Sequence, residues 1–176
     1  MMATIEITKE SFFIAAILGF FVRFVIQKIP SFWLHSLLNL PGTIAHETSH
    51  AIVSIFTFGK MTRFSIIPRR AGDKWVFGSI ECANLNNFNA FPIAMAPLIL
   101  LATPYFLGEI YAGHQLNVYF AAALWSITGI VCQASVPSAQ DFKVAFTYWL
   151  GTFAWIGLIA FYLFPEQVQG IFLKII

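Results

Sequence analysis

Residues 33–58 of this 176-residue chain read WLHSLLNLPGTIAHETSHAIVSIFTF. This apolar stretch is long enough for a helix that crosses a bilayer, which needs about 20 residues. Within it, His46-Glu47-Thr48-Ser49-His50 is an H-E-x-x-H motif. On a helix, His46 and His50 lie one turn apart on the same face, so both imidazoles can hold one metal ion. Glu47, beside that face, is then placed to act as a general base.

The composition is typical of a membrane protein. The chain is 59% hydrophobic and only 10% charged, whereas soluble proteins carry about 25% charged residues. We therefore expect one polytopic domain over residues 1–176, an integral multi-pass membrane protein surrounded by the lipid bilayer. A formal net charge of +2 does not indicate a nucleic-acid partner. Cys82 and Cys132 form no C-x-x-C pair, so we expect free thiols.

Apolar runs and helix breakers divide the chain into five predicted transmembrane helices. Arg23 lies inside the first, and Pro41 is expected to kink the second or to restart its helix. Strand-like segments flank a turn-rich stretch after the second helix, which predicts a β-hairpin over Met61–Glu81. The predicted fold class is therefore an all-α membrane protein with a short β-hairpin between the second and third helices. The predicted spans are Ser11–Ile29, Trp33–Phe58, Phe91–Leu107, Asn117–Gln133 and Asp141–Phe164.

The basic residues predict an orientation in the cell membrane. The loop Gly108–Gln115 has no Lys or Arg, whereas the connection between the second and third spans is rich in them. The positive-inside rule therefore places the hairpin and the N-terminus in the cytoplasm. The basic residues of that connection are Lys60, Arg63, Arg69, Arg70 and Lys74.

Two histidines leave a catalytic zinc site one ligand short, because such a site has three protein ligands and one open position. Asp141 is the candidate that we favour. It follows Pro137 at the break before the fifth span, where a carboxylate can project into the bundle. It could instead cap the last helix together with Ser138, and the two roles are compatible. Cys132, close to Asp141 in the sequence, is the rival ligand.

Other candidate ligands have simpler explanations. His35 precedes His46 by eleven residues, which is roughly 16 Å along a continuous helix and too far to share a metal. His114 is expected in a loop on the outer side, and Asp73 in the solvated turn of the hairpin. These residues are therefore expected to lie outside the metal site.

The motif is compatible with three kinds of protein. A zinc hydrolase needs the H-E-x-x-H spacing, and this favours hydrolysis. A membrane transporter could use intramembrane histidine and glutamate as a proton or ion path. A non-catalytic membrane scaffold could keep a relict metal site without turnover. The sequence names neither the substrate nor the oligomeric state.

Three segments resemble the site-2 protease family of intramembrane zinc metalloproteases. In that family a histidine helix runs into a glycine and a strand, as residues 46–68 do here. Met95-Ala96-Pro97-Leu98 is similar to the small-residue and proline motif of a later helix, and residues 137–141 to the segment with the third ligand. The chain departs from the pattern in having Ser49 where glycine is usual, Phe142 where glycine often follows the aspartate, and no PDZ-like domain.

The resemblance implies a Zn²⁺-dependent endopeptidase that cuts transmembrane or membrane-adjacent peptides inside the bilayer. It implies that His46, His50 and Asp141 are the zinc ligands and that Glu47 is the general base. A peptide must be extended to be cut, because a helical backbone hides its carbonyls in its own hydrogen bonds. The hairpin at Met61–Glu81 offers a strand edge for such a substrate.

Overall fold

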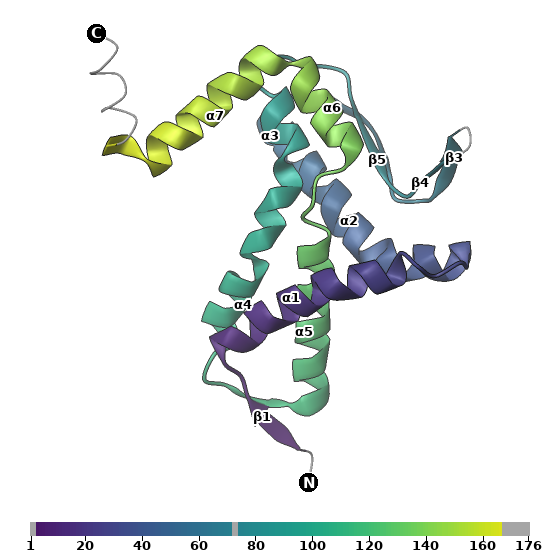
Figure 1. Cartoon of the computed structure of the whole chain (residues 1–176), viewed down its shortest axis with the longest axis vertical. Helices are drawn as coiled ribbons and strands as arrows, with labels where there is room; N and C mark the ends of the chain where they lie inside the picture. The colour runs from purple at the N-terminus through teal and green to yellow at the C-terminus, as the bar shows by residue number, and fades with distance from the viewer. Residues whose placement is uncertain (1–2, 72–73, 167–176) are drawn as a thin grey trace.

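The structure, a computed structural model, describes residues 3–71 and 74–166. Helices dominate it, and short antiparallel strand pairs lie beside them (Figure 1). The described elements, in chain order, are β1 (Thr4–Glu6), α1 (Lys9–Ile26), α2 (Phe32–Phe56), β2 (Met61–Ser65), β3 (Arg69–Ala71), β4 (Lys74–Val76), β5 (Ser79–Cys82), α3 (Ala90–Ala94), the 3-10 helix η1 (Ala96–Ala102), α4 (Thr103–Tyr111), β6 (Gln115–Asn117), α5 (Val118–Gln133), α6 (Ala139–Thr147) and α7 (Trp149–Leu163).

The expectation of five transmembrane helices is wrong. Among the described residues, no single helix is both long and apolar enough to cross a membrane. The pair α6 and α7 reaches that length and composition together, but the two helices are bent by 99° at the break between them. The 18 residues of α1 include Lys9, Glu10 and Arg23. The sequence prediction was based on the length of apolar runs. The length of a run shows neither where a helix bends nor how far charged residues reduce its apolar character.

Prolines explain why the third predicted span is broken. Pro97 stands at the start of η1, and Pro104 stands at the start of α4. A proline lacks the backbone N–H and its ring clashes with the preceding turn, so it is favoured where a new helix begins. Pro41 behaves differently, because α2 continues through it. The helix does not restart there, and one unbroken element carries the whole H-E-x-x-H motif.

The helices α1 and α5 cross at very close range (Figure 1). A Cβ added at Gly19 would lie 2.3 Å from the Gly129 carbonyl oxygen, so α1 has no room for a side chain at this crossing. Below the crossing, Phe12 and Ala121 are fully buried in a small apolar cluster. The pairing of β1 with β6, which the sequence did not predict, closes this end of the molecule.

The chain between α2 and α3 forms an antiparallel ribbon. β2 pairs with β5, and β3 pairs with β4 farther along. Aromatic contacts hold the β4 end of the ribbon to the beginning of α2, with the Phe32 ring centroid 4.0 Å from that of Trp75 and 5.9 Å from that of Phe77. The ribbon therefore lies alongside the helix that carries the motif.

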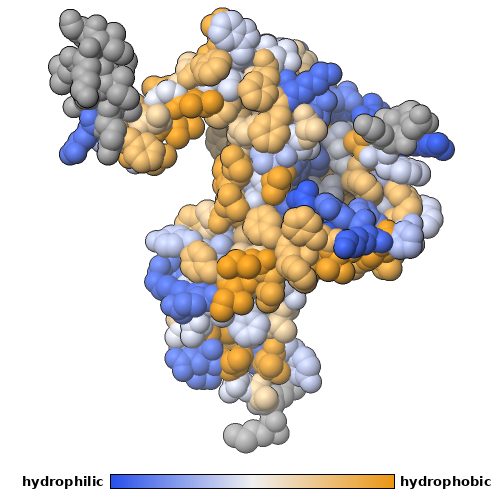
Figure 2. Space-filling view, in the orientation of Figure 1, coloured by the Kyte–Doolittle hydropathy of each residue, from blue (hydrophilic) through white to orange (hydrophobic). Residues whose placement is uncertain are grey.

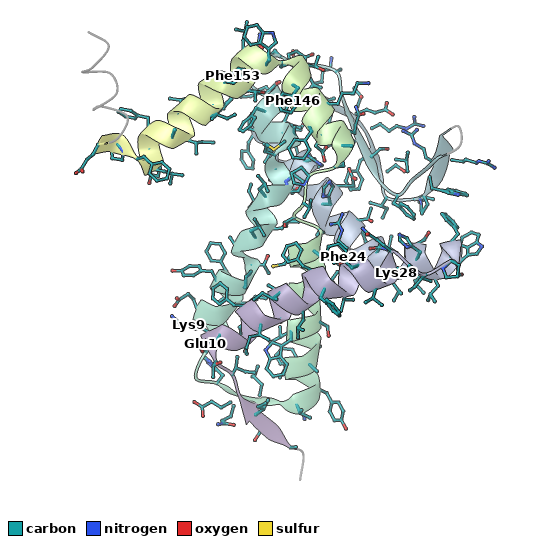
Figure 3. All side chains as sticks on the ribbon, viewed as in Figure 1. Lys9, Glu10, Phe24, Lys28, Phe146 and Phe153 are labelled. Atoms are coloured by element: carbon teal, nitrogen blue, oxygen red, sulfur yellow. The ribbon has the colours of Figure 1, made fainter. Side chains whose placement is uncertain are left out.

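Much of the outer surface is apolar (Figure 2). Large hydrophobic side chains are exposed on all the long helices, and α7 buries only Gly151 and Thr152 among its residues. Phe146 and Phe153, on either side of the bend between α6 and α7, lie on the outside (Figure 3). A soluble monomer rarely exposes apolar surface on this scale.

Candidate metal centre

Two helices bring three metal-ligating side chains together. His46 and His50 project from the same face of α2, and Asp141 lies in the first turn of α6. The two Nε2 atoms are 3.2 Å apart. Asp141 Oδ2 lies 3.4 Å from His46 Nε2, and Asp141 Oδ1 lies 3.3 Å from His50 Nε2. These three residues form a group that could hold a metal ion.

The three residues lie close enough to share one metal ion. Bonds of about 2.0–2.1 Å at tetrahedral angles place neighbouring ligand atoms about 3.3–3.4 Å apart. The two Nε2 atoms are near that separation, and each lies near it from a different oxygen of Asp141. One ligand atom from each of the three residues can be chosen so that all lie within 4.8 Å of one another. Three protein donors leave a fourth position for water or substrate.

Backbone carbonyls fix the orientation of both imidazoles. His46 Nδ1 lies 2.7 Å from the Ala134 carbonyl oxygen, and His50 Nδ1 lies 2.6 Å from the Ile93 carbonyl oxygen. A carbonyl oxygen only accepts, so in each ring Nδ1 carries the proton and donates it. Each Nε2 then presents its lone pair to the other donors, which is the arrangement of a metal-ligating histidine.

Asp141 acts as a helix cap and faces the histidines at the same time. Its backbone N–H donates to Ser138 Oγ at 3.2 Å, and its Oδ2 accepts from the Ser138 N–H at 2.6 Å, which completes a capping box. The capping role is thus confirmed, and it leaves Asp141 facing the two histidines. Burial opposes ionisation of Asp141, but when the two rings also carry a proton on Nε2, their hydrogen bonds hold the pKa of Asp141 below its ordinary range.

Glu47 is buried beside the group, with 8% of its surface exposed. Burial raises the pKa of its carboxyl above the ordinary value. Gly78, in the turn between β4 and β5, lies directly over it. A Cβ added at Gly78 would be 2.7 Å from Glu47 Oε1. A glycine is needed for this close approach of the ribbon to the carboxylate.

A cleft of about 810 Å³ opens beside His46, Glu47 and Asp141. The ribbon from Trp75 to Glu81 forms one wall, and the helices α2 and α6 contribute the others. The polar residues of α2 that line the cleft recur at helical spacing along one face of the helix. This pattern is visible in the sequence, but it did not enter the sequence-based prediction. Those residues are His35, Asn39, Thr43, His46 and Glu47.

The other candidate residues lie apart from this group. Cys132 is buried, with its Sγ 3.8 Å from the Leu100 carbonyl oxygen, and it is not a member of the cluster. His35 lines the far part of the cleft, and His114 Nδ1 is 3.2 Å from the Tyr111 carbonyl oxygen. Asp73 lies outside the described residues.

Sequence reasoning missed the supporting residues of the centre. The carbonyls of Ala134 and Ile93 orient the histidines, but a backbone carbonyl carries no signal in the residue type. Gly78 was read only as part of a strand-like segment. A glycine inside such a segment does indicate a close backbone approach, so this signal was available.

No family model matches the chain, and neither the curated proteins nor the solved structures contain a match to it.

Proposed function

We propose that this protein is a zinc-dependent endopeptidase of the site-2 protease type, and that it cuts transmembrane or membrane-adjacent peptides. The observation that carries the proposal is the convergence of His46, His50 and Asp141 with Glu47 buried next to them. A transporter or a scaffold does not require three clustered metal-ligating side chains with a buried carboxylate beside them. A zinc peptidase requires all of these features.

The donor set supports zinc as the metal. Two imidazoles and one carboxylate suit zinc, whereas magnesium and calcium prefer sites built from oxygen ligands. The Ala134 and Ile93 carbonyls accept hydrogen bonds from Nδ1 of His46 and His50, the ring nitrogens that would face away from the metal. Such hydrogen bonds are usual for histidines in zinc sites. When bound, zinc would supply Lewis acidity to a water molecule and to the scissile carbonyl.

The remaining chemistry belongs to Glu47. In the proposed mechanism its carboxylate takes a proton from the attacking water and delivers it to the nitrogen of the leaving amine. Its burial in the cleft wall keeps bulk water from competing for that proton. Gly78 holds the carboxylate on one side, which limits the positions it can adopt.

The ribbon supports an extended peptide as the substrate. β5 pairs with β2 along one edge, and its residues Ser79 and Ile80 line the cleft. A peptide strand added there would offer its backbone carbonyls toward the metal-ligating side chains. A helical substrate would first have to unwind, because its carbonyls are engaged in its own hydrogen bonds.

The apolar surface supports a membrane location for this reaction. Exposed side chains such as Phe21, Phe24, Phe56 and Phe153 would face lipid if the protein were embedded in a membrane. The proposal rests on this surface and not on helices of spanning length. A substrate in or next to the membrane would then lie in the same apolar environment as the outer surface of the protein.

The proposal is tested by zinc content and peptide cleavage measured on the same preparations in detergent. Wild type should bind about one zinc ion per chain, as one three-ligand site allows. His46→Ala and His50→Ala should lose the ion, whereas Glu47→Gln should retain it and lose cleavage. The control His114→Ala, which changes a histidine outside the group, should retain both. Correctly folded wild type without zinc, or full cleavage in Glu47→Gln, would contradict the proposal.

A further inference from the structure

Arg23 lines the cleft with few partners for its charge. It lies in the apolar helix α1, is partly buried, and its Nη1 donates to the Gln133 carbonyl oxygen at 2.5 Å. In the described part of the chain no carboxylate lies within ion-pair distance of it. Of the three carboxylates that line the cleft, Asp141 lies against His46 and His50, and Glu81 pairs with Arg63 and Arg69. The third, Glu47, forms no ion pair with Arg23.

A guanidinium has five N–H donors, and the single carbonyl contact leaves most of them unused. A partly buried cation without a counter-ion is unfavourable, because burial removes the water that would solvate it. A planar guanidinium also binds carboxylates through paired hydrogen bonds. These properties indicate that the cleft is completed by an anionic group from outside the chain.

The polar residues near Arg23 extend this surface. Gln27 follows it by one turn of α1, and Asn39 faces the same cleft from α2. The side-chain NH₂ group of Asn39 donates a hydrogen bond to the His35 carbonyl oxygen. The side-chain oxygen of Asn39 remains available as an acceptor. The buried Gln133 also lines the cleft, and its Oε1 accepts no hydrogen bond in the structure. The cleft is thus polar on several sides. Its other arginine, Arg69, pairs with Glu81, whereas Arg23 has no carboxylate partner among the described residues.

Two hydrogen bonds to neighbouring carbonyls place this charge near the metal-ligating group. Arg23 donates to the carbonyl of Gln133, and His46 donates to the carbonyl of the next residue, Ala134. Consecutive residues are about 3.8 Å apart, so this chain of contacts limits the distance from the guanidinium to His46 Nε2 to about 11 Å at most. An extended peptide covers such a distance in about three residues.

We propose that Arg23 is a specificity residue that binds a carboxylate of the peptide substrate, within about three residues of the bond that is cut. The inference rests on the proposed peptidase function. It predicts that acidic side chains, or a free C-terminal carboxylate, are preferred at that position of the substrate.

The test uses two series of peptide hydroxamates, since a hydroxamate binds zinc directly and is not cleaved. One series carries the hydroxamate at the N-terminal end and the other at the C-terminal end. In both, one to four leucines separate it from either glutamate or glutamine. Dissociation constants are measured on the zinc-loaded protein in neutral detergent. At one spacer length, wild type should bind the glutamate peptide about tenfold or more tightly than the glutamine peptide, as a charged hydrogen bond allows.

The variants show whether Arg23 causes that preference. Arg23→Gln should abolish it, and Arg23→Lys should retain only part of it, because lysine keeps the charge but not the paired donors. Lys28→Gln is the matched control. Lys28 is an exposed cation near the end of α1 (Figure 3) that does not line the cleft. Zinc content, measured on each variant, should be unchanged.

Each contrary outcome has a definite meaning. Tight binding with no glutamate preference at any spacer length in wild type overturns the role of Arg23 and leaves the zinc site standing. An equal loss of the glutamate preference in Lys28→Gln also overturns the role of Arg23. The preference would then come from the overall positive charge of the protein and not from a contact with Arg23. A preference that disappears when phosphatidylglycerol is added assigns Arg23 to a lipid phosphate and overturns the peptide role. Failure of every hydroxamate to bind contradicts this inference and the proposed function together.

Discussion

The carboxylate of Asp141 has two sets of partners, and substitutions can separate them. Asp141→Asn keeps the shape but removes the negative charge, so zinc affinity and cleavage should fall sharply. Ser138→Ala removes a helix cap and should lower the free energy of unfolding by about 1 kcal/mol. It should spare zinc, because the backbone N–H of Ser138 still donates to Oδ2. Zinc content and thermal unfolding measure the two effects.

The rival ligand provides the control for this prediction. Cys132→Ser should leave zinc and cleavage intact, since Cys132 is not a member of the cluster. If Asp141→Asn retained full zinc while Cys132→Ser lost it, the assignment of the third ligand would pass to Cys132.

Gly78 offers a second prediction at this scale. In Gly78→Ala the new methyl group would lie 2.7 Å from Glu47 Oε1 and would force the carboxylate to move. A displacement of about 1 Å at a reacting group can cost up to about 100-fold in rate, so cleavage should fall by about tenfold to 100-fold. Zinc content should not change, because no ligand is touched. Gly157→Ala, where a Cβ meets no atom within 4 Å, is the control that should keep full activity. Unchanged cleavage in Gly78→Ala would show that Glu47 is not held by the ribbon.

At the scale of elements, the crossing of α1 and α5 supports the metal centre from a distance. The residue after α5, Ala134, supplies the carbonyl that orients His46. Gly19→Ala would place a Cβ 2.3 Å from the Gly129 carbonyl oxygen, and backbone atoms there cannot move aside cheaply. We expect overpacking to lower the free energy of unfolding by about 1–3 kcal/mol.

Thermal unfolding measures that loss, and zinc affinity should fall with it because the crossing positions the end of α5. Gly157→Ala again serves as the control for a helical glycine that touches nothing. A Gly19→Ala protein with an unchanged unfolding midpoint would contradict the close crossing.

The elements also show where sequence reasoning succeeded and failed. The motif fixed the position of His46, Glu47 and His50 on one helix because helical periodicity is local. Asp141 was found by ligand chemistry and by the proline before it, although its approach to α2 depends on tertiary structure. The β1–β6 pairing and the bend between α6 and α7 were missed, since neither depends on an apolar run.

At the scale of the whole molecule, the apolar surface leads to a prediction about location. If it faces lipid, the protein should sediment with membranes, resist extraction by high salt or alkaline carbonate, and be released by detergent. The measurement is the fraction of the protein in each extract. A peripheral membrane protein of the same cells, released by carbonate, is the control. Recovery as a monodisperse monomer without detergent would contradict the membrane location.

The central claim is that His46, His50 and Asp141 together bind one zinc ion. X-ray absorption at the zinc edge, measured on purified wild type, tests it most directly. We expect nitrogen and oxygen ligands at about 2.0–2.2 Å, with the imidazole scattering of two histidines. A sulfur ligand at about 2.3 Å, or a zinc spectrum unchanged in His46→Ala, would contradict it.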